Sequence, residues 1–121
     1  MKNLLIVDDQ PGIRLLLSEV FRKEGLETRL ASNGAEALRS VRERKPDCVL
    51  LDMKMPGIDG VEVLKRIKKE SPYIPVFMMT AYGEIELTEQ ALNNGAEKYI
   101  TKPFNIYEVR DAVMDVILNK K

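Results

Sequence analysis

The chain has 121 residues and a mass of 13.8 kDa, which suits one domain with a hydrophobic core. It carries 19 Lys and Arg against 19 Asp and Glu, so its net charge is zero and nothing favours a nucleic-acid or membrane-binding surface. It has no signal-peptide pattern and no apolar run long enough to span a membrane, and its single cysteine has no histidine to activate it. We therefore expect a cytoplasmic protein in which Cys48 is a small buried hydrophobe.

Short apolar runs alternate with amphipathic segments along the whole chain. The apolar runs predict strands, and the segments with apolar residues three and four positions apart predict helices. Strands are predicted at residues 4–7, 27–31, 48–52, 75–80 and 98–101, the second of them more polar and nearer a sheet edge. Helices are predicted from Ile13 to Glu24, from Asn33-Gly34 to the residues before Lys45-Pro46, from Asp59-Gly60 to the turn at Pro72, from about Glu84 to Asn94, and from the cap at Asn105 to near the chain end.

This pattern is a strand followed by a helix, repeated five times with short connections. It predicts an α/β fold, a doubly wound parallel sheet covered by helices on both faces. We expect residues 1–121 to form one domain with no further effector domain.

Four of the predicted strands end in polar residues suited to a common site: Asp8-Asp9, Asp52, Thr80 and Lys102. The carboxyl ends of parallel strands share one edge of the sheet, so these side chains should meet there. Three crowded carboxylates repel one another, and a bound divalent cation relieves the repulsion. Oxygen ligands and a small number of carboxylates favour Mg²⁺.

A metal ion, a lysine and a hydroxyl donor around one carboxylate are what a phosphoryl group requires. Asp52 is therefore predicted to accept a phosphoryl group as an acyl phosphate. Each residue alone has an ordinary interpretation: a turn or helix cap for Asp8-Asp9 and Asp52, a strand end for Thr80, and an exposed loop lysine for Lys102. Their joint occurrence at strand ends is what those interpretations leave unexplained.

The stretches LLIVDDQ, VLLDMKMPGIDG, FMMTAYGE and YITKPF resemble the receiver domains of bacterial two-component response regulators, in order and spacing. The resemblance covers essentially the whole chain and implies a flavodoxin-like or CheY-like sheet with strand order 2-1-3-4-5. It implies phosphorylation of Asp52 and direct Mg²⁺ binding, with Mn²⁺ as a substitute, by Asp9, Asp52 and the Lys54 backbone carbonyl, while Asp8 binds mainly through water. It further implies that Thr80 and Lys102 bind phosphoryl oxygens, and that the Lys102–Pro103 bond is cis.

Within the family, VDDQ, LLDMK, MTAYGE and KPF with their neighbouring residues resemble single-domain members that act in sporulation phosphorelays. Such a protein takes phosphate from a sensor histidine kinase and passes it to a histidine phosphotransferase, with a phosphatase as an optional partner. It is an enzyme only as a phosphotransferase intermediate, and we expect a monomer. Two residues differ from those sporulation members: Pro11 stands where they have an aromatic residue, and Tyr99 stands where they have a histidine. These differences concern the identity of the partners and not the chemistry.

Three alternatives remain at this stage. One is a chemotaxis-type regulator that acts by phosphorylation-dependent binding, and another is the receiver of a DNA-binding regulator. The third is a hydrolase of the aspartyl-phosphate class, which typically needs a second aspartate two positions after the nucleophile. Lys54 occupies that position, which disfavours the hydrolase.

The resemblance also suggests a switch pair, Thr80 and Tyr99, and a docking surface around the acidic site. Ile13 and Leu16 are expected to be partly exposed there, although amphipathic stripes usually belong to the core. The long side chains of Lys54 and Tyr82 suggest a persistent phosphoaspartate. The full docking surface is predicted as Gln10, Pro11, Gly12, Ile13, Leu16, Tyr82, Gly83, Pro103 and Phe104.

Overall fold

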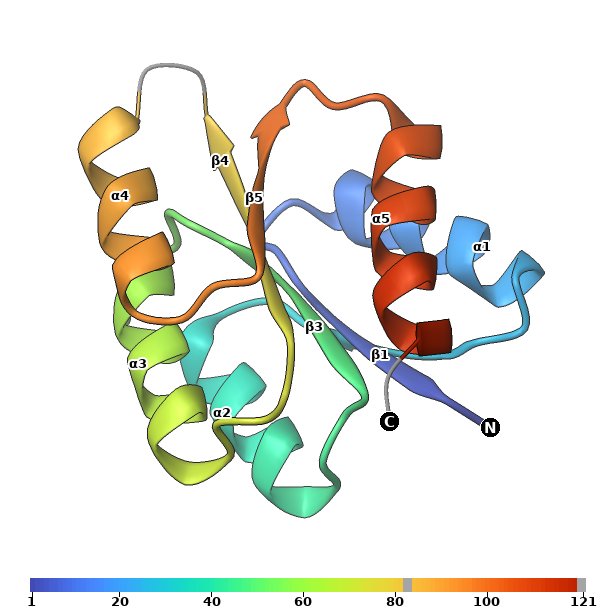
Figure 1. Cartoon of the computed structure of the whole chain (residues 1–121), viewed down its shortest axis with the longest axis horizontal. Helices are drawn as coiled ribbons and strands as arrows, with labels where there is room; N and C mark the ends of the chain where they lie inside the picture. The colour runs from blue at the N-terminus through green and yellow to red at the C-terminus, as the bar shows by residue number, and fades with distance from the viewer. Residues whose placement is uncertain (82–83, 120–121) are drawn as a thin grey trace.

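A computed structural model of the chain describes residues 1–81 and 84–119 and contains a single sheet of five parallel strands (Figure 1). Across the sheet the strands lie in the order β2-β1-β3-β4-β5, which confirms the predicted architecture and its 2-1-3-4-5 order. The elements are β1 (Asn3–Val7), α1 (Pro11–Lys23), β2 (Glu27–Ala31), α2 (Gly34–Glu43), β3 (Cys48–Asp52), α3 (Gly60–Glu70), β4 (Val76–Ala81), α4 (Ile85–Asn93), β5 (Lys98–Lys102) and α5 (Ile106–Asn119).

Helices cover both faces of the sheet, with α1 and α5 on one face and α2, α3 and α4 on the other (Figure 1). Alternate side chains of each central strand enter the two layers. Leu4 and Ile6 of β1 pack with Phe21 of α1, whereas Leu5 and Val7 pack in the opposite layer. Because β1, β3 and nearly all of β4 are buried on both faces, their sequences are continuous apolar runs without alternation.

The edge strands β2 and β5 are more exposed than the central ones. Most residues of β2 are half-buried and every residue of β5 is exposed or half-buried, which explains the polar character of both sequences. The prediction that β2 lies near an edge is confirmed.

Asparagine and aspartate side chains begin two of the helices as the sequence predicted. Asn33 accepts a hydrogen bond from the Glu36 backbone N–H, and Asp59 accepts one from the Glu62 N–H. The first helix begins at Pro11, two residues before the apolar stripe that starts at Ile13, and a missing N–H costs nothing in a first turn. These caps set where each helix leaves the edge of the sheet that bears the polar strand ends.

Among the described residues, no helix combines the length and the apolar character required to cross a membrane.

The buried residues of α1 are Leu17, Ser18 and Phe21. Leu16 and also Leu15 lie on the exposed part of that helix.

Candidate functional site

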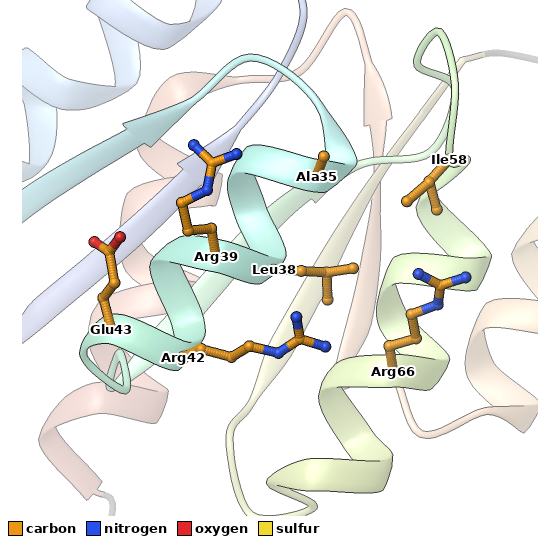
Figure 2. A pocket seen from close by; sticks show the side chains of 7 residues that line it. All are labelled: Ala35, Leu38, Arg39, Arg42, Glu43, Ile58 and Arg66. Atoms are coloured by element: carbon orange, nitrogen blue, oxygen red, sulfur yellow. The ribbon is translucent and has the colours of Figure 1, made fainter.

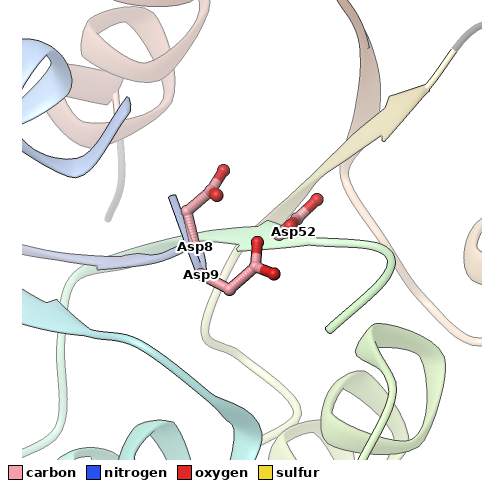
Figure 3. A group of neighbouring side chains, drawn as sticks. All are labelled: Asp8, Asp9 and Asp52. Carbon is pink, nitrogen blue, oxygen red and sulfur yellow. The ribbon is translucent and has the colours of Figure 1, made fainter. Parts of the chain in front are cut away.

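Three aspartates meet at the carboxyl edge of the sheet (Figure 3). Asp8 and Asp9 follow β1, and Asp52 ends the neighbouring strand β3. One carboxylate oxygen from each residue lies within 4.8 Å of the others. Asp8 is fully buried, Asp52 is 7% exposed and Asp9 is exposed, so the group opens to solvent on the Asp9 side.

Lys102 supplies the positive charge of the site. Its ammonium lies 2.8 Å from an Asp8 carboxylate oxygen and 3.3 Å from an Asp52 oxygen. The pairing of β4 with β5 sets Lys102 beside Ala81, and the pairing of β3 with β4 sets Asp52 beside Met79. The sheet register therefore brings Lys102 to the acids across an intervening strand.

Burial, with the charge of Asp8, disfavours ionised Asp52. Burial, reinforced by the negative charge of Asp8, raises the pKa of Asp52 to about 6, although Lys102 acts in the opposite direction. Burial by itself lowers the pKa of Lys102, but its hydrogen bond to Asp8 and the charge of Asp52 outweigh burial and raise that pKa. Burial is thus the main cause of the Asp52 shift, and the nearby carboxylates are the cause of the Lys102 shift.

Oxygen ligands with uncompensated negative charge fit a hard divalent cation such as Mg²⁺. Asp8, Asp9 and Asp52 each offer one carboxylate oxygen to such an ion. The buried carboxylate of Asp8 is held in place by the Gln10 backbone N–H, which donates to it over 2.9 Å. The donor set is therefore suited to Mg²⁺, and its buried member Asp8 is fixed in position.

The loop between β3 and α3 returns close to Asp52. Met53 and Met55 anchor it in the core, and the φ of +83° at Gly57 is a left-handed conformation that glycine adopts without strain. A methyl group at Gly60 would lie 2.4 Å from the Asp52 carbonyl oxygen, so only glycine permits this approach. Gly60 also donates its backbone N–H to the Met53 carbonyl over 2.9 Å, which closes the loop that contains Lys54.

An ion pair connects this loop to the start of α4. The Lys54 ammonium lies 3.2 Å from Glu84, whose other carboxylate oxygen accepts a hydrogen bond from the Ala81 N–H over 2.6 Å. The Glu84 side chain is 9% exposed. Sequence patterns did not single out Glu84, because an ion pair between two loops depends on their paths in space and leaves no periodic signal.

Thr80 and Tyr99, the predicted switch pair, line one cavity of about 430 Å³ between β4, β5 and α4. Thr80 is buried at 2% exposure, near the end of β4. Tyr99 is largely exposed on β5 and adjoins Met78 in the register. The structure thus puts both side chains beside a space in which an aromatic ring can be accommodated.

The predicted docking surface is drawn from α1 and from the residues that follow β1, β4 and β5 in the sequence. Leu16 is 45% exposed and Ile13 is half-buried, as predicted from the width of the apolar stripe. Leu15, which the sequence reasoning did not include, is 59% exposed. Tyr82 and Gly83 lie outside the described residues. The remaining predicted members are exposed or half-buried, namely Gln10, Pro11, Gly12, Pro103 and Phe104.

Two further features near the site concern the backbone. The guanidinium of Arg14 donates to the Asp8 carbonyl oxygen over 2.6 Å and ties the start of α1 to the acidic group. No motif indicated this contact. The Lys102–Pro103 peptide bond is cis, as the resemblance implied.

The comparisons with known proteins all indicate one family of domains. A model of the response regulator receiver domain family matches residues 4–114. Sporulation initiation phosphotransferase F of Bacillus subtilis is 54% identical over 93% of this chain and 90% of its own length. Regulatory protein AtoC of Escherichia coli is 41% identical over 90% of this chain, which spans only 24% of that relative.

Solved structures of receiver domains align with this chain over almost its whole length. The CheY-like receiver domain protein of Methanospirillum hungatei aligns with a TM-score of 0.93 at 30% identity, covering 97% of this chain and 94% of the other. The receiver domain of NtrX from Brucella abortus aligns with a TM-score of 0.91 at 34% identity, covering 97% and 99%.

Proposed function

Because this chain belongs to the response regulator receiver family, we propose that it receives a phosphoryl group on Asp52 from a sensor kinase phosphohistidine and relays it to a histidine phosphotransferase. The observation that carries the proposal is the convergence of Lys102 on Asp8 and Asp52 at 2.8 and 3.3 Å. The likeness to a sporulation initiation phosphotransferase over nearly its entire length supports a relay within sporulation.

In the proposed transfer an Asp52 carboxylate oxygen attacks the phosphorus. The bond between phosphorus and the imidazole nitrogen breaks, an Asp52 O–P bond forms, and the bonding electrons return to the imidazole. The Lys102 ammonium donates to one oxygen of the transferred phosphoryl group, and the Thr80 hydroxyl donates to another oxygen of that group. The reverse sequence on a second histidine completes the relay.

Mg²⁺, for which Mn²⁺ can substitute, would supply the charge that neutralises the phosphoryl oxygens. We assign its binding to Asp9, Asp52 and the Lys54 backbone carbonyl, with Asp8 acting mainly through water. Among these groups, the Asp8 carboxylate adds to the burial that raises the Asp52 pKa, and a bound cation would oppose both effects. Asp8 also accepts the Lys102 ammonium and so links metal binding to phosphoryl binding.

The partner surface is proposed to be the start of α1 and the turn after β5. Exposed Leu16 and half-buried Ile13 and Phe104 offer apolar contact around a polar pocket. Such a surface suits the apolar flank of a helix that presents a histidine. Tyr99 and Thr80 are the proposed switch that senses the phosphoryl group, since both border one cavity.

A second candidate is the receiver of a longer regulator. The chain covers only about a quarter of regulatory protein AtoC and 27% of full NtrX, so the same fold serves as one module in those proteins. We infer that residues 1–121 act as one receiver domain, because the family model spans residues 4–114.

The two candidates separate in a phosphate chase. The protein is phosphorylated with a labelled histidine kinase, freed from the kinase, and mixed with a histidine phosphotransferase. Movement of the label to the second histidine protein within seconds to minutes supports the relay. If the label stays on this protein with every phosphotransferase offered, the relay is contradicted. That result would leave the phosphorylation of Asp52 by the kinase unaffected.

A further inference from the structure

Arginine side chains line a hollow of about 460 Å³ between α2 and α3, but their guanidinium groups do not converge on a common point (Figure 2). Arg42 pairs with Glu70 over 3.3 Å, and Arg66 pairs with Glu62 over 3.0 Å, near the opposite end of α3. All four side chains are about half exposed, and exposed ion pairs of this kind contribute little to stability. The contact that Arg14 of α1 makes at the acidic site is of a different kind.

Arg14 holds the backbone on both sides of Asp9. Its guanidinium donates to the Asp8 carbonyl oxygen over 2.6 Å, and its backbone N–H donates to the Gln10 carbonyl oxygen over 3.2 Å. A hydrogen bond from a charged donor is stronger than one between neutral groups. Arg14 is also half-buried, which limits the access of water to this bond. One residue of α1 thus restrains the chain immediately before and immediately after Asp9.

The Asp8 carbonyl belongs to the peptide bond that joins Asp8 to Asp9. A peptide group is planar, so a bond to its oxygen limits the rotation of the whole group and the direction in which the chain enters Asp9. Asp8 has restraints of its own, because its carboxylate accepts hydrogen bonds from the Gln10 N–H and the Lys102 ammonium. The Asp9 carboxylate is exposed and has no hydrogen bond or ion pair within the part of the chain that the structure describes. Its place in the acidic group therefore depends on the backbone that Arg14 holds.

We propose that Arg14 is a positioning residue of the metal site, which keeps the Asp8–Asp9 backbone in the conformation that lets Asp9 bind Mg²⁺ together with Asp52. This assignment rests on the proposed role of Asp9 as a metal ligand. Arg14 is not a ligand itself, so its effect on the metal passes through Asp9. Replacement of a residue that orients a metal ligand commonly lowers metal affinity by about ten- to a hundredfold.

The direction of the effect separates positioning from charge. A guanidinium near the acidic group repels a cation, so the loss of its charge alone should strengthen Mg²⁺ binding. Loss of the hydrogen bond to the Asp8 carbonyl should weaken Mg²⁺ binding instead. Weaker binding after the Arg14 charge is removed therefore cannot come from electrostatics.

The test is a Mg²⁺ titration of the full, unphosphorylated chain, followed through the amide NMR signals of Asp9 and Met53. Arg14→Gln is expected to bind Mg²⁺ about tenfold more weakly than the wild type. Arg14→Lys keeps a cationic donor of shorter reach and should lie between the two. Arg22→Gln removes the same charge from the exposed part of α1 and, as the control, should bind Mg²⁺ at least as tightly as the wild type.

A double-variant cycle shows whether Arg14 acts through Asp9. In the Asp9→Asn background, Arg14→Gln should change the Mg²⁺ affinity by less than about twofold. A general structural role of Arg14 would lower the affinity by the same factor in both backgrounds. The amide spectrum shows whether each variant is folded, and Arg14→Lys serves in the cycle if Arg14→Gln does not fold.

Two results would overturn the proposal: an Mg²⁺ affinity in Arg14→Gln that equals or exceeds that of the wild type, and an equal loss of affinity in the Asp9→Asn background. If Asp9→Asn alone binds Mg²⁺ as tightly as the wild type, the proposed metal role of Asp9 fails, and the role of Arg14 fails with it. If Asp9→Asn weakens Mg²⁺ binding and Arg14→Gln does not, only the role of Arg14 is refuted.

Discussion

The Lys102 ammonium lies 3.3 Å from the Asp52 carboxylate although 50 residues separate the two in the sequence. The same ammonium is closer still to buried Asp8, at 2.8 Å. One cation thus serves two carboxylates, and exposed Asp9 adds a third negative charge beside them.

Asp52→Asn should stabilise the protein when divalent cations are removed. The folded-state pKa of about 6 lies above the ordinary value of 3.8, so the folded protein holds a proton that the unfolded chain has lost. Stability therefore falls as pH rises from about 4 through 6, and the ionised carboxylate costs on the order of 2 kcal/mol above that window. Asparagine removes this cost.

The measurement is urea unfolding of both proteins in EDTA at pH 7.5 and pH 4. The variant should be more stable at pH 7.5 and equal to the wild type at pH 4. Equal stability at pH 7.5 would show that the fold tolerates the ionised group without penalty.

Mg²⁺ should raise the stability of the wild type, because the ion binds the folded acidic group and not the unfolded chain. Asp9→Asn should remove most of that gain, since exposed Asp9 has no other role among the described contacts. Asp111→Asn, on the exposed face of α5, is the control and should keep the full gain. The readout is the unfolding midpoint over a Mg²⁺ titration. If Asp9→Asn gained as much stability as the wild type, Asp9 would not be a metal ligand.

Gly60→Ala should destabilise the fold by about 3 kcal/mol or more, because the methyl group would overlap the Asp52 carbonyl and the Met53 backbone. Gly12→Ala is the matched control. An added methyl there meets nothing within 4 Å, so stability should stay the same or rise by up to about 1 kcal/mol. Chemical unfolding compares the two, and a mild effect at Gly60 would mean that the loop can move away from Asp52.

Leu16→Ala should slow phosphoryl transfer while costing less than about 1 kcal/mol of stability, because its side chain is already 45% exposed. The neighbouring Leu17 is fully buried, and Leu17→Ala should cost about 2–5 kcal/mol. Transfer rates from a kinase and unfolding free energies are measured on the same preparations. A large stability loss in Leu16→Ala would assign that residue to the core.

The lifetime of the phosphoaspartate should depend on the Lys54–Glu84 ion pair. Glu84 is nearly buried and holds the long lysine side chain two residues beyond Asp52, where it can exclude water. Lys54→Ala should therefore shorten the lifetime several-fold, and Glu84→Gln should shorten it less. Loss of label from purified phosphoprotein in Mg²⁺ is the measurement, and an unchanged lifetime in Lys54→Ala would exclude shielding by this side chain.

Much of the fold could be predicted from the sequence because it depends on local patterns. Continuous apolar runs marked the central strands, and Asn33 and Asp59 marked two helix starts at the residues where they cap. The meeting of Asp8, Asp52 and Lys102 followed from one rule, that parallel strands end at the same edge.

The rest depends on geometry that a one-dimensional pattern does not contain. Periodicity identified an apolar stripe on α1 that leaves out Leu15, but it did not indicate that this exposed leucine adds to the apolar surface next to Leu16. Contacts such as Arg14 with the Asp8 carbonyl are set by where a loop turns. The pKa of Asp52 depends on burial and on opposing charges, and no single residue type predicts the direction of its shift.

Mass spectrometry of the intact protein after incubation with acetyl phosphate and Mg²⁺ tests the central claim most directly. The wild type should gain the mass of one phosphoryl group, and Asp52→Ala should gain none. Wild-type protein that stays unmodified, or an Asp52→Ala variant that is modified to the same extent, would contradict Asp52 as the acceptor.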